Sequence, residues 1–287
     1  MSIVKIQNLT VKISGNIILR NLTLSIDSGE ICCILGKNGA GKSTFLKSIL
    51  GIGEVEGEIS LLNQAINLKT RRNLLEKIGV LIDRPLSYNH LTVWKNLEIV
   101  AMLHDIKEEE ILVNTLKITG LYEEKQKKVS QLSSGMKQRL GLAIAYVHSP
   151  QVLILDEPTT ALDPQSVVEF RNLIKQINKQ FNTTIIYSTH HLEEAMKMSS
   201  RILIIKEGVI AFDSKIEKIE ELSVIRIPRE HCTDIRIEEF DYFEEDNTIS
   251  FLLNSHSHKL KSFLIFKPYL RPATLEDIYL AKHKSIV

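Results

Sequence analysis

The chain has 287 residues, enough for one large domain or two small ones, and its 44% hydrophobic content is sufficient for a buried core. Its net charge of +1 gives no general attraction to nucleic acid, so no nucleic-acid partner is expected. Three cysteines are too few for a disulfide framework. The sequence shows no secretory leader and no apolar run near the roughly 18–20 residues of a membrane span. We therefore expect no membrane-spanning segment, and any pore would belong to another polypeptide.

The first part of the chain predicts short strands joined by turns, at Ile3–Leu9 and Leu19–Ile26. A third, fully apolar strand at Ile31–Leu35 leads into a glycine-rich loop of the form G-x-x-x-x-G-K-[ST]. The loop consists of Gly36, Lys37, Asn38, Gly39, Ala40, Gly41, Lys42, Ser43 and Thr44.

This loop has the composition of a phosphate cradle. Glycines allow backbone N–H groups to point inward around a phosphate without a Cβ clash. Lys42 would reach the β- and γ-phosphates, and the Ser43 hydroxyl is a ligand for Mg²⁺. Because Thr44–Leu50 predicts a helix, the phosphates would lie at a helix N-terminus.

A mainly helical segment begins after another predicted strand at Gly57–Leu62. Apolar residues recur at helical spacing in Val93–Leu103, Glu108–Thr119 and Gly135–Val147. The segment, about residues 86–148, lies between the phosphate loop and the next group of strands. We therefore expect a helical insertion rather than a separate tail.

Two carboxylates follow the next buried strand, Val152–Leu155. A strand of this kind carries them to its C-terminal end, where ligands bind in open α/β sheets. Asp156 would hold Mg²⁺, directly or through water, and Glu157 would orient and polarise an attacking water. A core strand that ends in an acidic turn is the alternative, which the phosphate loop upstream makes less favourable.

The later part of the core alternates between helix and strand. Asp163 and Pro164 predict the start of a helix to about residue 181, Thr184–Tyr187 predicts a parallel strand, and residues 201–212 predict a hairpin. Strands that alternate with helices predict an α/β fold with a mostly parallel sheet, to which the N-terminal strands add an antiparallel part.

Residues 213–287 are interpreted as a small C-terminal extension of amphipathic and strand-like pieces. An acidic run over residues 238–246 predicts a solvated face. His256 and His258 flank a serine, and two histidines alone do not make a metal site.

The segment Leu132–Arg139 stands before a predicted helix and resembles the signature motif of ABC ATPases, usually written LSGGQ. Ser134 replaces the first glycine of that motif and Met136 replaces its glutamine. Ser133 and the Gly135 N–H remain, and both can contact a phosphate at a helix N-terminus.

Further motifs follow in the order typical of this family. Ala161–Asp163 matches the D-loop, His190 matches the switch histidine, and Pro272–Leu280 resembles the ending of ABC-2 exporter ATPases. The resemblance implies a P-loop NTPase core, with an ABC ATPase domain at residues 1–212 and the extension at 213–287.

Family membership would also imply partners. Two such domains, expected to be identical chains, face each other head to tail, and each ATP lies between one phosphate loop and the partner's signature motif. A separate integral-membrane permease docks in the groove between core and helical insertion. The chain would therefore lie at the cytoplasmic side of the cell membrane, peripheral through the permease.

Two positions depart from the family pattern. Asp83 stands where the Q-loop glutamine is usual, which is reminiscent of bacitracin-type and lantibiotic-immunity ATPases. Its carboxylate is expected to contribute to nucleotide and Mg²⁺ binding; the alternative is that it turns to solvent while the loop acts through its backbone. Ile13 stands where an aromatic ring usually stacks on adenine, a contact worth on the order of 1–3 kcal/mol, so weaker adenine discrimination is expected.

A possible docking surface lies near the Q-loop position. Leu86, Tyr88, Leu91 and Trp94 would form an apolar patch for the permease, and the alternative for Trp94 is ordinary helix packing.

These features predict the ATP-hydrolysing subunit of an ABC transporter, an exporter of a drug, peptide or bacteriocin, with ATP and Mg²⁺ bound. Lys42, Glu157 and His190 would carry hydrolysis, while Ser133, Gly135 and Asp163 would serve nucleotide binding. One alternative is a soluble ABC ATPase in translation, repair or cofactor assembly, which usually carries two cassettes or a long coiled coil. The other is a non-catalytic nucleotide-gated module, against which Glu157 and His190 argue.

Overall fold

The computed structural model describes residues 1–82, 87–232, 240–245, 248–254, 263 and 269–283. An antiparallel sheet at the N-terminus has the strand order β2-β1-β4-β5. Its strands are β1 (Ser2–Ile13), β2 (Asn16–Asp27), β4 (Glu54–Leu61) and β5 (Gln64–Ala65). The predicted antiparallel part is confirmed, with longer strands than the apolar pattern alone indicated, because polar residues extend each strand beyond its buried segment.

A second sheet forms the centre of the molecule, in the order β10-β9-β3-β8-β7-β6. Its strands are β3 (Ile31–Leu35), β6 (Ile78–Leu81), β7 (Val152–Leu155), β8 (Thr184–Thr189), β9 (Arg201–Lys206) and β10 (Val209–Lys215). Five of them are parallel, and only the edge strand β10 is antiparallel to its neighbour. The fold is therefore α/β with a mostly parallel sheet, as predicted.

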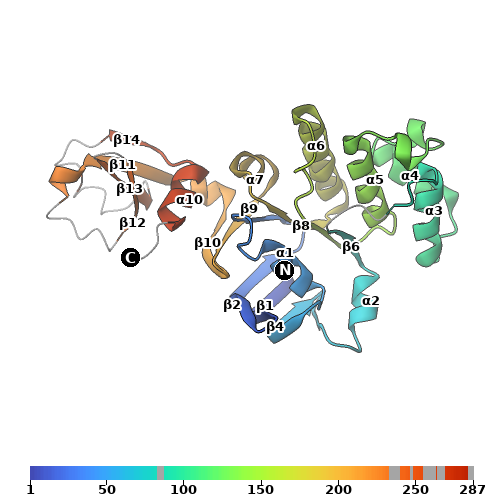
Figure 1. Ribbon diagram of the computed structural model, residues 1–287, viewed down its shortest axis with the longest axis horizontal. Helices are drawn as coiled ribbons and strands as arrows, with labels where there is room; N and C mark the ends of the chain where they lie inside the picture. The colour runs from blue at the N-terminus through green and yellow to red at the C-terminus, as the bar shows by residue number, and fades with distance from the viewer. Residues whose placement is uncertain (83–86, 233–239, 246–247, 255–262, 264–268, 284–287) are drawn as a thin grey trace.

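Helices cover both faces of this sheet (Figure 1). They are α1 (Lys42–Ile49), the short α2 (Arg71–Leu75), α6 (Pro164–Phe181) and α7 (Leu192–Met198). Helix α6 begins where the sequence predicts, because Asp163 accepts a hydrogen bond from the Ser166 N–H and Pro164 occupies the first turn. It ends at Asn182, whose φ of 52° lies in the left-handed region.

The helical insertion has its own hydrophobic core. It contains α3 (Val93–Leu103), α4 (Glu109–Ile118), the 3-10 turns Tyr122–Glu124 and Val129–Gln131, and α5 (Ser134–Tyr146). Helix α5 also packs on the central sheet, because Leu142, Ala145 and Tyr146 belong to the core beneath β6 and β7. The insertion is thus tied to the sheet by one helix.

A third, antiparallel sheet forms the C-terminal extension, in the order β12-β13-β11-β14. Its elements are α8 (Ile216–Glu220), β11 (Leu222–Pro228), the 3-10 turn Arg229–His231, β12 (Asp241–Glu245), β13 (Thr248–Asn254), β14 (Tyr269–Pro272) and α10 (Leu275–His283). The described part of the acidic run forms β12, where Asp241, Glu244 and Glu245 pair with Lys282, Arg229 and Arg226. His256 and His258 lie outside the described residues.

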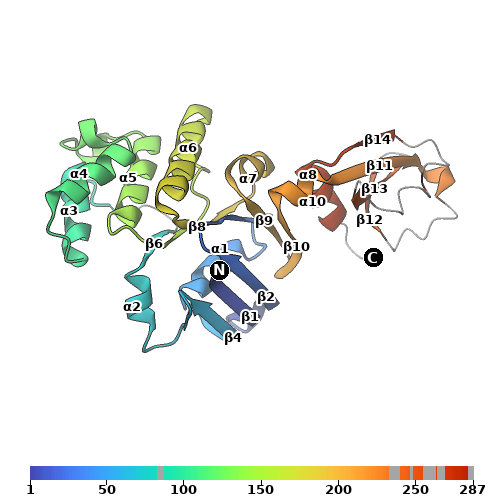
Figure 2. The ribbon, with the colours of Figure 1, turned by 180° about the vertical axis from the view of Figure 1, so that it is seen from behind.

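The helical insertion and the extension lie at opposite ends of the long axis, with the central sheet between them (Figure 1). Seen from behind, the N-terminal antiparallel sheet lies below the central sheet, and α2 descends between it and the insertion (Figure 2). None of the helices in the described segments combines the length and apolarity needed to cross a membrane.

Candidate functional site

The phosphate loop joins the buried strand β3 to helix α1 and is held tightly at two glycines. A Cβ on Gly36 would lie 2.6 Å from the Ile205 carbonyl oxygen, and one on Gly41 would lie 2.7 Å from the Leu19 side chain. Gly41 also has a φ of 103°, which a side chain would strain, and it caps α1 without a side-chain acceptor. The first N–H groups of α1 are consequently available to an anion.

Lys42 is buried at the base of this loop, with only 5% of its side chain exposed. Its Nζ donates to the carbonyls of Gly36 (3.0 Å) and Lys37 (3.2 Å) and lies 3.2 Å from Glu157 Oε1. The two loop carbonyls and the Glu157 carboxylate supply the partners that a buried ammonium group needs.

The two acids after β7 occupy different surroundings. Asp156 is fixed behind the site, because its N–H donates to the Leu81 carbonyl (2.8 Å) and its carboxylate accepts from Ser188. Glu157 turns toward the loop, with a positive φ of 44°. Its N–H donates to Ser188 Oγ (2.9 Å), and its Oε2 accepts from Thr160 Oγ1 (3.0 Å).

Glu157 is surrounded by groups that favour its charged form. Burial raises the pKa of Glu157, but hydrogen bonds from Lys42 and Thr160, the Lys42 charge and His190 outweigh that effect and hold it below the usual range. His190 Nδ1 lies 3.3 Å from Glu157 Oε2. The carboxylate is therefore ionised at neutral pH, the form that a general base requires.

Glu157 and the loop share one cavity of ≈ 340 Å³. The cavity is lined by Ile13, Ile18, Asn38, Gly39, Gly41, Lys42, Ser43, Thr44 and Glu157. Ile13 is 51% exposed and lines the cavity together with Ile18. The described residues that line the cavity include no aromatic ring, and the adenine contact at Ile13 stays a prediction.

The signature residues form a second arrangement at the start of α5. Ser133 caps the helix by accepting from the Met136 N–H (3.2 Å), and it remains exposed. A Cβ on Gly135 would lie 2.8 Å from Ser166 Oγ, and that hydroxyl donates to Asp163 (2.6 Å). The described residues that line the cavity include none of Ser133, Gly135 and Asp163. Within one chain, Gly135 and Asp163 are thus connected through Ser166, and neither lines the phosphate-loop cavity.

Two predicted residues, Asp83 and Leu86, lie outside the described residues. Of the rest of the proposed docking patch, Tyr88 is 55% exposed, whereas Leu91 and Trp94 are half-buried. Trp94 packs against the core of the helical insertion. Among the described residues of the patch, only Tyr88 is mainly exposed, and the docking role of the patch stays a prediction.

Sequence reasoning missed Ser188 and Thr160, which hold the two acids. The only signal for Ser188 is a hydroxyl near the end of a predicted strand, since its role depends on the pairing of Leu155 with Tyr187. Thr160 had no signal beyond its place three residues after Glu157.

The residues present fit a nucleotide with Mg²⁺. A glycine-rich loop, a helix N-terminus and a buried ammonium group suit phosphates, and the hydroxyl of Ser43 and carboxylate of Asp156 are oxygen ligands of the kind that Mg²⁺ prefers. Ser43 lines the cavity, and Asp156 directly precedes Glu157, which also lines it.

Comparisons with known proteins agree with this geometry. The family model described as "ABC transporter" matches residues 19–160. The bacitracin transport ATP-binding protein BcrA of Enterococcus faecalis is 32% identical over 266 residues, covering 92% of this chain and 81% of that protein. The lantibiotic transport ATP-binding protein SrtF of Streptococcus pyogenes is 36% identical, covering 76% of this chain and 93% of that protein.

Solved structures show the same fold. The chain is similar to cbiO1 from Clostridium perfringens, described as part of the ABC transporter complex cbiONQ, with a TM-score of 0.71 and 31% identity over 76% of this chain and 90% of that one. It is also similar to an ATP-binding cassette solved as a dimer bound to ADP and Pi, with a TM-score of 0.67 and 28% identity over 74% of this chain and 98% of that one.

Glu157 and His190 at the phosphate cavity argue against a non-catalytic module, and the similarity to transport ATP-binding proteins favours a transporter subunit over a soluble ABC ATPase. ABC cassettes of this kind act as dimers and pair with a membrane permease. The chain belongs to the ABC transporter family, as an ATP-binding and ATP-hydrolysing subunit.

Proposed function

We propose that the chain powers an exporter of a drug, peptide or bacteriocin from the cytoplasmic side of the cell membrane. Two relatives named for bacitracin and lantibiotic transport support this, one of which aligns over 92% of the chain. The observation that carries the catalytic part is the contact of Glu157 with both Lys42 and His190 at the phosphate cavity.

The residues divide the work as follows. Lys42 and the loop N–H groups hold the phosphates, while Ser43 and Asp156 hold Mg²⁺, together with Asp83 if its carboxylate reaches the site. Mg²⁺, when bound, neutralises charge that develops on the phosphate oxygens. When ATP is bound, phosphate oxygens would replace Glu157 as the partner of Lys42. The Glu157 carboxylate is then free to orient a water and accept its proton. Ser133, Gly135 and Asp163 serve the nucleotide of the second chain.

Replacing Glu157 tests the catalytic proposal. Glu157→Gln removes the base but keeps the shape, so turnover should fall roughly 10²–10⁴-fold while ATP affinity is retained. An ATP-bound dimer should accumulate, as measured by size-exclusion chromatography. Glu193→Gln is the matched control, because Glu193 is an exposed acid of α7 that pairs with Lys197. Near-normal turnover in Glu157→Gln would remove this residue from the mechanism.

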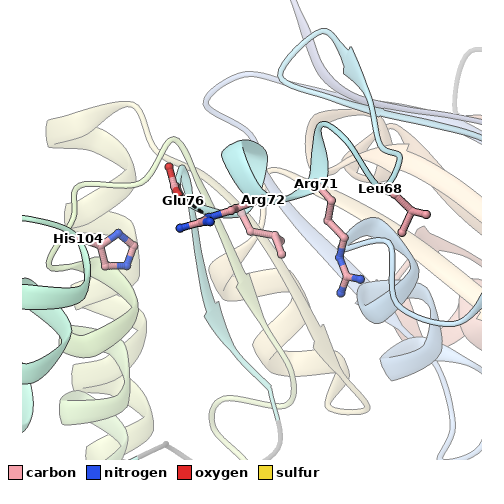
Figure 3. A pocket seen from close by; sticks show the side chains of 6 residues that line it. Leu68, Arg71, Arg72, Glu76 and His104 are labelled. Carbon is pink, nitrogen blue, oxygen red and sulfur yellow. Dashed lines mark ion pairs between the residues drawn. The ribbon is translucent and has the colours of Figure 1, made fainter.

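A groove between α2 and the end of α3 is the proposed docking site of the permease (Figure 3). It has a volume of ≈ 550 Å³ and is lined by Leu68, Arg71, Arg72, Leu75, Glu76 and His104. Leu68 is 95% exposed; Arg72 pairs with Glu76 at 3.6 Å, so Arg71 leaves the groove with a net positive charge. These features suit a permease helix that carries apolar and acidic side chains.

A charge reversal tests this groove. Arg72→Glu should reduce the fraction of the chain that sediments with membranes and leave the basal ATPase rate of the isolated chain unchanged, because Arg72 lies away from the phosphate cavity. Lys175→Glu on the exposed side of α6 controls for the change in net charge. Equal membrane association of the two variants would contradict the assignment.

A further inference from the structure

Ser188 is a fully buried hydroxyl in the central strand β8, with 0% of its surface exposed. It follows Tyr187, which pairs with Leu155 at the end of β7. The parallel register therefore brings Ser188 beside the two acids that follow Leu155. A buried hydroxyl needs hydrogen-bond partners, and those of Ser188 identify its role.

The hydrogen bonds of Ser188 run in a fixed direction. A hydroxyl has one proton, and Ser188 donates it to Asp156 Oδ1. Its lone pairs then accept from the Glu157 N–H at 2.9 Å. A single side chain thus connects the carboxylate proposed to hold Mg²⁺ with the backbone of the proposed general base.

The backbone of Glu157 needs this support. Its φ of 44° lies in the left-handed region, which a residue with a Cβ adopts only when the surroundings hold it there. The hydrogen bond to Ser188 fixes the Glu157 peptide plane in that conformation. Glu157 then projects toward Lys42 and His190 rather than along the strand.

We propose that Ser188 is a positioning residue for hydrolysis, one that sets the orientation of the Asp156 carboxylate and of the Glu157 main chain together. This inference rests on the proposed function, because it takes the roles of the two acids from there. Ser188 lies two residues before His190, which follows the end of β8, so it also links the switch histidine to the acid pair.

The inference predicts an effect on turnover rather than on nucleotide recognition. In Ser188→Ala, kcat should fall roughly 10–100-fold while KM for ATP changes less than threefold, because the phosphate loop is untouched. Mg²⁺ should also increase the affinity for ATP less in this variant than in the parent. Calorimetric titration with ATP, with and without Mg²⁺, at a temperature too low for hydrolysis measures that increase. Ser188→Thr keeps the hydroxyl and should recover most of kcat.

Ser48→Ala is the matched control. Ser48 is also fully buried, and its hydroxyl donates to the Phe45 carbonyl (2.7 Å) within α1. Its loss should lower the melting temperature about as much as the loss of Ser188 does, with kcat within twofold of the parent. The proposal would be overturned if the kcat of Ser188→Ala stayed within twofold of the parent, or if Ser188→Thr folded without restoring kcat.

The Glu157→Gln background separates this inference from the proposed function. Because Ser188 acts partly through Glu157 and partly through Asp156, adding Ser188→Ala to Glu157→Gln should lower kcat by clearly less than Ser188→Ala does alone. Additive losses would show that Ser188 acts elsewhere and overturn the inference. Normal turnover in Glu157→Gln alone would instead overturn the proposed function, irrespective of Ser188.

Discussion

His148 lies where the helical insertion meets the central sheet. Its Nε2 is 3.2 Å from the Ile78 carbonyl oxygen, and its ring stacks on that of His104 with centroids 4.0 Å apart and planes 4° from parallel. Burial and, to a lesser extent, the neighbouring His104 lower the pKa of His148 to about 4, against the hydrogen bond to Ile78, which raises it. The imidazole is therefore neutral in the folded protein at physiological pH.

This lowered pKa predicts acid sensitivity. Between the ordinary histidine value of 6.5 and about 4, the unfolded chain binds a proton at His148 that the folded chain does not, so the free energy of unfolding falls as pH falls through that range. His148→Gln removes this titration, and its stability should depend less steeply on pH between 6.5 and 4. Urea unfolding at pH 7 and pH 4.5 measures the difference.

The exposed His90 supplies the control for that experiment. His90→Gln should leave the pH dependence of stability close to that of the parent. Equal slopes for the parent and His148→Gln would show that His148 does not contribute.

At the scale of single residues, the sequence predicted groups whose chemistry is carried by local spacing. Lys42 follows a glycine loop, and Asp156 and Glu157 follow a buried strand, so each is recognisable from its neighbours. Ser188 was not predicted to act, because its partners lie 31 and 32 residues away in sequence and meet it only through strand register.

At the scale of elements, strands and helices with strong local signals were predicted well. Helix α6 has a capping aspartate and an initial proline, β3 and β7 are apolar throughout, and β8 is fully buried with polar residues only at its two ends. The pairing of α5 with β6 has no such signal, because it depends on a close approach of two distant segments. That approach occurs at Gly79, where a Cβ would lie 2.0 Å from the Ala145 carbonyl oxygen.

Gly79→Ala should therefore destabilise the joint between the insertion and the sheet. The added methyl group meets backbone rather than a flexible side chain, and it also falls 2.5 Å from Leu153 Cδ2, so α5 must shift. Overpacking of this kind costs about 1–3 kcal/mol. Thermal unfolding should show a lower melting temperature than the parent. Val80→Ala, at the exposed neighbouring position, should change stability by about 0.5 kcal/mol at most; equal effects of the two changes would contradict the packing argument.

At the scale of the whole molecule, the sequence predicted three parts but not how their interiors join. Strand β10 runs from Val209 to Lys215, across the predicted boundary at residue 212. One continuous core contains Leu275 and Ile278 of α10 together with Ala195 and Met198 of α7. No local pattern in the sequence shows which side chains face each other across that boundary. The division into 1–212 and 213–287 therefore stays a prediction about function.

The shared core links the two ends of the molecule through α5. Leu142, Ala145 and Tyr146 of that helix pack in the same core as α10, whereas its Leu140 and Val147 pack in the core of the insertion. A contact chain of buried side chains therefore connects the extension with Trp94, the single tryptophan, which packs on the insertion's core. Loss of packing at one end should be transmitted to the other if these cores unfold together.

Ile278→Ala tests that coupling. Ile278 is fully buried on α10, and truncating it should cost about 2–5 kcal/mol of folding free energy. Leu280→Ala is the control, since Leu280 is 37% exposed on the same helix and its loss should cost far less. Urea unfolding followed by both circular dichroism and Trp94 fluorescence should give one shifted transition with the same midpoint for both signals. A circular dichroism curve that splits in two while the Trp94 midpoint stays at the parent value would mean that the extension unfolds independently, despite the core it shares with α7.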